Sequence, residues 1–149
     1  MAKLALDELQ NPTIPVVATS LLHNLKEVSI DSYNTFKASG ITEISQAIEI
    51  LTIDRNRAND NAYLKSYYDL IFNSPDFVGR VKVFDKLDNM FMLCLNRDDH
   101  IRRRYIEEIE EFVLPLARSK VPHLARYIEL LAVNCMEVGF IGLDDYRSN

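Results

Sequence analysis

The sequence predicts an all-α protein, a single compact bundle of about six helices over residues 1–149. Apolar residues recur at intervals of three and four along most of the chain, which is the period of a helix with one buried face. Only 4 residues are glycine, whereas sandwiches and barrels need many tight turns. Helix start and stop signals divide the apolar stretches, and no internal repeat occurs, so a bundle is favoured over a solenoid.

The first part of the chain predicts an arm and then a long helical stretch. Residues 1–13 are a short amphipathic segment, interpreted as an N-terminal arm or a fraying helix. A helical pattern begins at Pro15, which suits a first turn because its missing N–H would be unpaired there. A shift of pattern at residues 29–31 indicates one bent helix or two abutting helices, and Gly40 should end it in a left-handed conformation. The expected inward positions include Val17, Leu21, Leu25 and Val28.

Three helix starts follow in the middle of the chain. Thr42 is expected to cap a helix whose inner face holds apolar residues, and the polar stretch 55–61 should then form a loop. Asp60 or Asn61 caps the next helix. The motif "SPDF" at 74–77 is a strong start signal, and the helical register after it outweighs the strand-like alternation in "GRVKVF". The expected core stripe of that helix is Phe77, Val81, Phe84, Leu87, Phe91 and Leu95.

The charged stretch "NRDDHIRRRYIEEIEE" at 96–111 begins the next helix, which runs to about Ser119. Pro115 lies inside it and should kink it or end it early. Most of the charges fall on the face opposite the apolar stripe and should meet water. The expected stripe is Ile101, Tyr105, Ile106, Ile109, Phe112, Val113 and Leu116, whereas Leu114 falls on the polar face.

Arg102 is the exception, because it falls within the apolar arc of that helix. Asp98 lies four residues earlier over the same face. A guanidinium in that position needs a partner or must reach outward to water. We expect a partly buried pair of Asp98 and Arg102; the alternative is an arginine offered to an acidic or phosphate-bearing partner.

The remaining apolar faces point to partners. The last helix begins at 121–122 and ends near Gly139, before a tail at 140–149, and its core stripe should be Leu124, Tyr127, Ile128, Leu131, Cys135 and Val138. In residues 63–72 the apolar arc spans about 200°, so this helix is either central or offers tyrosines to an interface. The residues predicted to bind a partner are Tyr63, Tyr67, Tyr68, Arg102, Arg103, Leu114, Leu130 and Val133.

Composition and motifs exclude several kinds of site. The net charge of -5 repels phosphates, and no phosphate-binding glycine motif or hydrolase nucleophile motif occurs. The three histidines do not have the helical spacing of metal ligands. We therefore predict no catalytic residue, no cofactor and no metal, and expect the protein not to be an enzyme.

The sequence also indicates a compartment. Cys94 and Cys135 stand in apolar runs, which indicates buried, reduced thiols. The N-terminus has no signal-peptide pattern, and no apolar run has the length of about 20 residues that a membrane span needs. The sequence thus predicts a protein of the cytoplasm, or of a host cytoplasm, that does not enter a membrane.

The preferred hypothesis is an acidic, regulatory protein that binds another protein, or itself as a homo-oligomer, in the manner of an adaptor or inhibitor. A nucleic-acid-associated subunit using the arginines at 102–104 is an alternative. The pair Arg118 and His123 in "RSKVPH" resembles that of the HEPN ribonucleases, small all-helical enzymes that cut RNA with such a pair; the resemblance implies the same role here, although 121–122 break the helix between them. An immunity-type protein that binds a basic partner is a third hypothesis.

Overall fold

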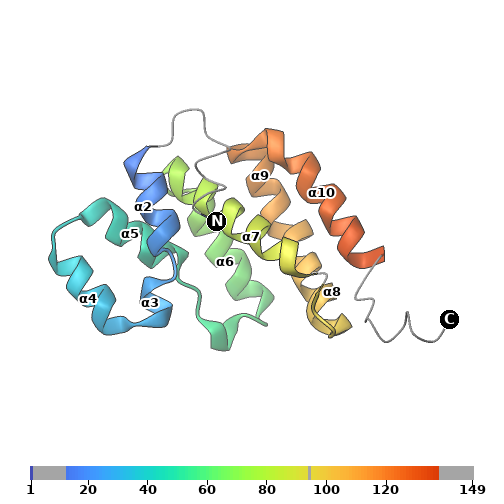
Figure 1. Ribbon diagram of the computed structural model, residues 1–149, viewed down its shortest axis with the longest axis horizontal. Coiled ribbons are helices and arrows are strands. Elements are labelled where there is room, and N and C mark those ends of the chain that lie inside the picture. The colour runs from blue at the N-terminus through green and yellow to red at the C-terminus, as the bar shows by residue number, and fades with distance from the viewer. Residues whose placement is uncertain (2–12, 94, 138–149) are drawn as a thin grey trace. The chain divides into compact units, whose positions relative to one another are not determined.

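The computed structural model describes Met1, residues 13–93 and residues 95–137, and its regular elements are helices (Figure 1). No strand occurs in these ranges, so the predicted all-α class is confirmed. The chain divides into two compact units, Met1–Asp85 (unit 1) and Lys86–Asn149 (unit 2). The single domain over residues 1–149 stays a prediction. The predicted arm and tail, like Cys94 and Val138, lie outside the described residues, apart from Met1 and Thr13.

Unit 1 is built from short helices. They are α2 (Ile14–Leu22), α3 (Leu25–Val28), α4 (Ile30–Ala38), α5 (Thr42–Leu51), the 3-10 turn η1 (Arg55–Arg57), α6 (Asn61–Phe72) and residues 76–85 of α7 (Asp76–Leu93). The stretch before Gly40 thus contains three helices, with a second break at residues 23–24 in addition to the expected one near Ser29. Each break leaves backbone groups to be satisfied by caps or turns.

The caps confirm several start and stop signals. Gly40 has a φ of 82°, the left-handed conformation that ends α4. Asp60, one of the two expected caps, accepts a hydrogen bond from Tyr63 N at 3.1 Å. The expected cap at Thr42 is wrong by one residue: Ile41 is the N-cap, and the Thr42 hydroxyl donates to Gly40 O at 3.3 Å.

The first core of unit 1 forms around Tyr33 on α4. Tyr33, Ile44 and Ile48 are buried together, and partly buried apolar side chains of Ala18, Leu22, Leu25 and Phe36 pack against them. The phenol of Tyr33 donates to Ser45 O at 3.3 Å. Burial, then a hydrogen bond to Glu49 and the charge of Glu49, raise the pKa of Tyr33 to about 12.

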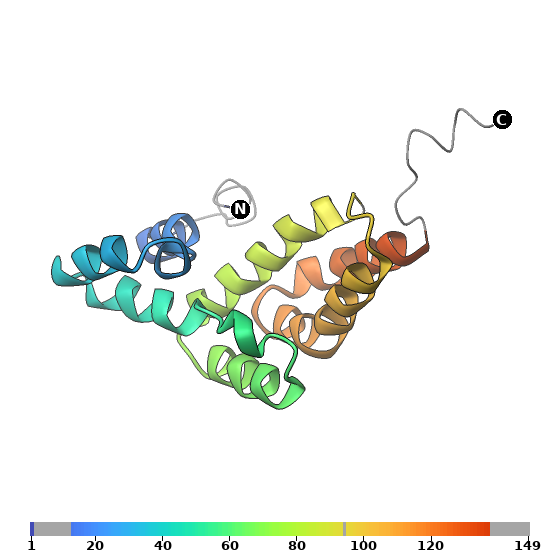
Figure 2. The same ribbon diagram turned by 90° about the horizontal axis from the view of Figure 1, so that it is seen from below.

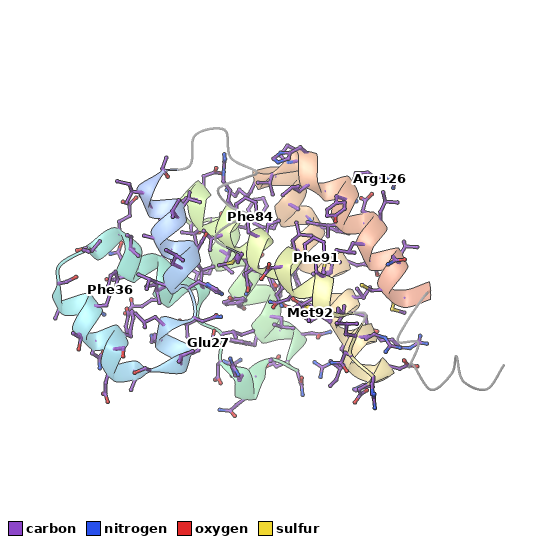
Figure 3. All side chains as sticks on the ribbon, in the orientation of Figure 1. Glu27, Phe36, Phe84, Phe91, Met92 and Arg126 are labelled. Carbon is purple, nitrogen blue, oxygen red and sulfur yellow. The ribbon has the colours of Figure 1, made fainter. Side chains whose placement is uncertain are left out.

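Glu27 on α3 anchors the loop that follows α5. Its Oε2 accepts from Nε and Nη2 of Arg55 at 3.1 and 2.9 Å, and its Oε1 accepts from Ile53 N at 3.4 Å. Figure 3, which draws all described side chains, labels Glu27 and Phe36 of this unit. The Glu27 carboxylate is nearly buried, whereas the Arg55 side chain is largely exposed to water.

The buried residues of α2 and α3 differ from the expected stripe, and the burial of the α6 tyrosines favours one of its two interpretations. On α2 the buried residues are Val16, Thr19 and Ser20, while Leu21 is exposed, and Val28 on α3 is exposed as well. On α6, Tyr67 and Tyr68 are buried, and the Tyr67 hydroxyl donates to Leu51 O at 2.6 Å. These two tyrosines of α6 therefore pack inside unit 1 and do not form an exposed surface.

Unit 2 contains residues 86–93 of α7, then α8 (Asp99–Glu108), the π-helical turn η2 (Ile109–Val113), α9 (Leu114–Lys120) and α10 (Pro122–Glu137). The helices α8 and α9 both pack against α10, as Figure 2 shows. Pro115 was expected to kink its helix or end it early; instead a π turn precedes it, and α9 continues through it to Lys120. Leu114 N donates to Ile109 O five residues back, which widens the helix just before a residue that has no N–H to donate.

The predicted burial around the π turn is wrong in part. Leu114, which an ideal wheel places on the polar face, is only 7% exposed, whereas Leu116 is buried as the ideal wheel predicts. Phe112 and Tyr105, expected in the stripe, are half-buried, whereas Ile106, Ile109 and Val113 are buried as expected.

The helix α7 carries two buried lysines, and each has a carboxylate and a tyrosine ring beside it. In unit 1, Lys82 Nζ lies 3.2 Å from Asp85 Oδ2 and 5.3 Å from the centre of the Tyr67 ring. In unit 2, Lys86 Nζ lies 2.7 Å from Glu108 Oε1 and 4.5 Å from the centre of the Tyr105 ring. Such partners compensate the cost of removing an ammonium group from water.

Substituting Lys86 should remove the positive charge that lies 2.7 Å from the Glu108 carboxylate. We expect Lys86→Met to lower the free energy of unfolding by about 2–4 kcal/mol, and Lys86→Met with Glu108→Leu to recover most of that loss. Urea unfolding followed by circular dichroism measures both. Lys65→Met, at an exposed lysine of α6, is the matched control and should change stability by less than about 0.5 kcal/mol. Equal losses from Lys65→Met and Lys86→Met would contradict the role of the pair.

The pKa of Tyr33 makes stability depend on pH in the alkaline range. The folded state favours the protonated phenol, with a pKa of about 12, whereas the unfolded chain releases this proton near about 10. The free energy of unfolding gained from this group is therefore complete below pH 10 and is lost as the pH rises from about 10 to 12. Denaturant unfolding at a series of pH values should show a smaller alkaline loss in Tyr33→Phe than in the native chain. Parallel curves for the two proteins would refute this.

Candidate interaction surface

The charged start of α8 is held by its own residues. Asp98 is the N-cap and accepts from His100 N at 2.8 Å and from Ile101 N at 3.2 Å. Arg102 is buried, and its guanidinium donates to Asn96 O and to Asp99 Oδ1. The expected pair of Asp98 and Arg102 is wrong, because the cap already occupies the Asp98 carboxylate and Asp99 lies within reach one turn before Arg102.

The burial of Arg102 has two consequences for this helix. Ile101, expected in the core, is exposed, because the buried stripe begins one residue later. The guanidinium of Arg102 is buried and engaged by Asn96 O and Asp99, whereas Arg103 beside it is exposed. Asp99, Arg102, Arg103 and Met136 line a polar recess of about 30 Å³, room for one or two water molecules.

At the end of α7 the predicted core stripe reaches the surface. Its first four members up to Leu87 are buried or half-buried. Phe91 is 42% exposed, and Leu95 one turn later is also exposed, so both correct the expectation of burial. Met92 is exposed beside them. Figure 3 labels Phe91 and Met92 near the end of α7 and Arg126 on α10.

The helix α10 contributes the other half of an apolar surface. Leu130 and Val133 face outward, as the wheel predicted, and Leu130 is 52% exposed. Tyr127, expected in the core, is 46% exposed. The buried face of α10 consists of Leu124, Ala125, Ile128, Ala132 and Cys135, so it is turned away from Tyr127.

One ring contact joins the two helices. The centres of the Phe91 and Tyr127 rings lie 6.2 Å apart with planes tilted by 47°. The α7–α10 apolar surface is defined here as Phe91, Leu95, Tyr127 and Leu130, flanked by Met92 and Val133. Aromatic and methionine side chains that lie together at the surface are typical of protein interfaces.

Positive charge borders this surface on the α10 side. Arg118 Nη2 lies 2.6 Å from Glu129 Oε1, and Arg126 Nη1 lies 3.2 Å from Glu129 Oε2. Hydrogen bonds from Arg118 and then Arg126 lower the pKa of the Glu129 carboxyl. Two guanidinium groups therefore share one carboxylate, and both are more than half exposed. The cluster of these three side chains has a net positive charge, which favours an acidic group on a partner.

The structure separates the residues predicted to bind a partner. Tyr63 is half-buried, and Tyr67 and Tyr68 are buried, all three in unit 1. In unit 2, Arg102 and Leu114 are buried, while Arg103, Leu130 and Val133 are exposed. Phe91, Leu95 and Tyr127 were not predicted as surface residues. Their helical spacing identified them as apolar stripes but did not reveal that no described helix covers them.

Other chemistry has little support in the described ranges. No group of three or more His, Cys, Asp or Glu residues that could hold a metal ion occurs there. Of the helices in the described part, none has both the length and the apolar character needed to cross a membrane. Arg118 is paired with Glu129, and the backbone leaves helical geometry at Val121 before His123. Nucleic-acid binding and cleavage stay predictions.

Comparison with known proteins identifies no relative, because no family model, no curated protein and no solved structure matches this chain. Function therefore has to be inferred from the surfaces of the molecule itself. A fold alone would not decide it, since one helical architecture serves many unrelated functions.

The two neighbouring arginines of α8 should differ in their effect on stability. Arg102→Met should lower the free energy of unfolding by about 1–3 kcal/mol, because its hydrogen bonds to Asn96 O and Asp99 hold the start of α8. Arg103→Met, one residue away and exposed, should change it by less than about 0.5 kcal/mol. Thermal or urea unfolding measures both. Equal effects of the two substitutions would show that the contacts of Arg102 do not stabilise the helix start.

Proposed function

We propose that this chain is a non-enzymatic protein-binding protein whose unit 2 receives an amphipathic helix of another protein on the α7–α10 apolar surface. The observation that carries the proposal is the exposed pair of Phe91 and Tyr127, two aromatic rings in contact from separate helices. Two aromatic rings left in water lose the free energy that their burial would supply. A partner that covers them recovers it.

The form of the surface favours a helical partner. Phe91 lies in the last turn of α7 and Leu95 lies just after the end of that helix, four residues later, while Tyr127 and Leu130 are one turn apart on α10. Two adjacent helices with apolar residues at this spacing match a third helix that carries apolar residues three and four positions apart. Single exposed apolar residues are ordinary, but side chains in contact across two helices form a patch.

The charge at the border favours acidic residues on the partner. Arg118 and Arg126 share Glu129, so a carboxylate on the incoming helix would complete the pairing. This also distinguishes the proposal from the immunity-type hypothesis, which needs a basic partner.

Cys135, buried with its thiol 3.7 Å from Met90 O, is consistent with the proposed cytoplasmic location.

Synthetic helical peptides test the proposal directly. The probes are fluorescent peptides of about 20 residues. Their leucines are spaced alternately three and four residues apart, which puts them on one helix face, and the polar face carries either glutamate or lysine. We expect the glutamate peptide to bind with micromolar affinity and more tightly than the lysine peptide, with a preference that decreases as salt is added. Fluorescence anisotropy measures the binding.

A double substitution on the surface provides the decisive comparison. Tyr127→Ala with Leu130→Ser should weaken binding by at least about tenfold. Phe72→Ala with Leu70→Ser removes a similar exposed aromatic and leucine from α6 of unit 1 and should leave binding unchanged. The proposal is wrong if neither peptide binds or if the two double variants bind alike. It is also wrong if sedimentation shows a homodimer that the Tyr127 and Leu130 substitutions dissociate, since a second copy would then occupy the surface.

A further inference from the structure

The helix α2 is packed on unit 1 with its polar face inward. Its buried residues are Val16, Thr19 and Ser20, and Thr19 has no exposed surface at all. His23, which directly follows the helix on the same face, has a side chain only 15% exposed. A helix on the surface of a globular unit ordinarily turns its apolar stripe to the core and its hydroxyls to water.

The inward polar atoms of α2 are poorly satisfied. Among the described residues, Thr19 Oγ1, Ser20 Oγ and His23 Nε2 have no hydrogen-bond partner. His23 Nε2 approaches Asp85 Oδ1 to 3.4 Å without forming a hydrogen bond, and the other oxygen of Asp85 lies 3.2 Å from Lys82 Nζ. Burying a hydroxyl without a partner removes its hydrogen bonds to water and so disfavours the packed arrangement.

The outward face of the same helix is apolar. Ile14 is 81% exposed and Leu21 is 67% exposed, while Val17 between them is half-buried. These three residues lie within one side of the α2 wheel, with Thr19 opposite them and Ser20 next to Val17 at the border of the two sides. The contact of α2 with the Tyr33 core is made by an edge, since Ala18 and Leu22 pack against that core only partly buried.

Local features add little to hold α2 in place. Thr13 at its start makes no side-chain cap, and the helix has no acidic residue in its first turn and no basic residue in its last. With 9 residues it is shorter than the length at which an isolated helix becomes stable in water. Breaks at residues 23–24 and at Ser29 separate it from α4. Its stability therefore depends on a docking face that carries unpaired polar atoms.

We propose that α2 is a displaceable helix. It exchanges between the docked arrangement and a released one, in which Thr19 and Ser20 regain water, whereas Ile14 and Leu21 are already exposed in the docked arrangement. Release uncovers the edge of the Tyr33 core that Ala18 and Leu22 touch, so the docked helix is a built-in cover of that core. The inference concerns unit 1 alone and is independent of the α7–α10 surface of unit 2.

Hydrogen–deuterium exchange of the full chain, followed by mass spectrometry, tests the proposal without any substitution. Amides of α2 should exchange at least about a hundredfold faster than those of α5, which is 10 residues long and carries a well-buried apolar face. The comparison of two helices of similar length within one unit corrects for global unfolding, which would affect both alike. Equal protection of α2 and α5 in the native chain would overturn the proposal.

Removing the two hydroxyls should hold α2 in place. Thr19→Val with Ser20→Ala keeps the shapes and should slow exchange of α2 amides by about tenfold, leaving α5 unchanged. Thr35→Val with Ser66→Ala is the matched control; these exposed hydroxyls donate to Asp31 O and Ala62 O at 3.0 Å, and their loss should not slow α2. Faster exchange of α2 in the first variant would show that its hydroxyls are satisfied and would overturn the proposal. If that variant fails to fold, the native comparison of α2 with α5 decides alone.

Discussion

The lysines of α7 impose the main constraint on this protein, because both keep an ammonium group where water is largely excluded. Lys82 and Lys86 each have a carboxylate and a tyrosine ring beside them, in unit 1 and unit 2 respectively. An ammonium without such partners would favour local opening of the surrounding helices. The positions of Tyr67 and Tyr105 are thereby determined by charge as well as by apolar packing, and the helices that carry them must approach α7 at those points.

Local chemistry made several elements predictable from the sequence. Gly40 ends a helix because a left-handed residue is needed there, and Asp60 begins one because a carboxylate can accept from backbone amides. The helix predicted from "SPDF" is present as α7, although its centre alternates like a strand. These signals depend on neighbours a few residues away, so they do not require knowledge of the tertiary structure.

Predictions that depended on tertiary neighbours were less successful. Helical period identified Phe91 and Tyr127 as members of apolar stripes, but period cannot tell how far along a helix the covering elements extend. On α2 the opposite error occurred: Thr19 and Ser20 are buried, although threonine and serine are mostly exposed in proteins. Arg102 was predicted correctly as a charge on the inner face. Its partner is Asp99 and not Asp98, because the Asp98 carboxylate accepts hydrogen bonds from the backbone at the start of the helix.

The π turn at Ile109–Val113 has a consequence for comparing this chain with others. A turn of this kind contains one residue more than the α-helical turn it replaces, so it is equivalent to a single-residue insertion that the helix has absorbed. A relative of this chain that lacks both the proline at 115 and the extra residue would therefore align with it only through a one-residue gap within 109–113.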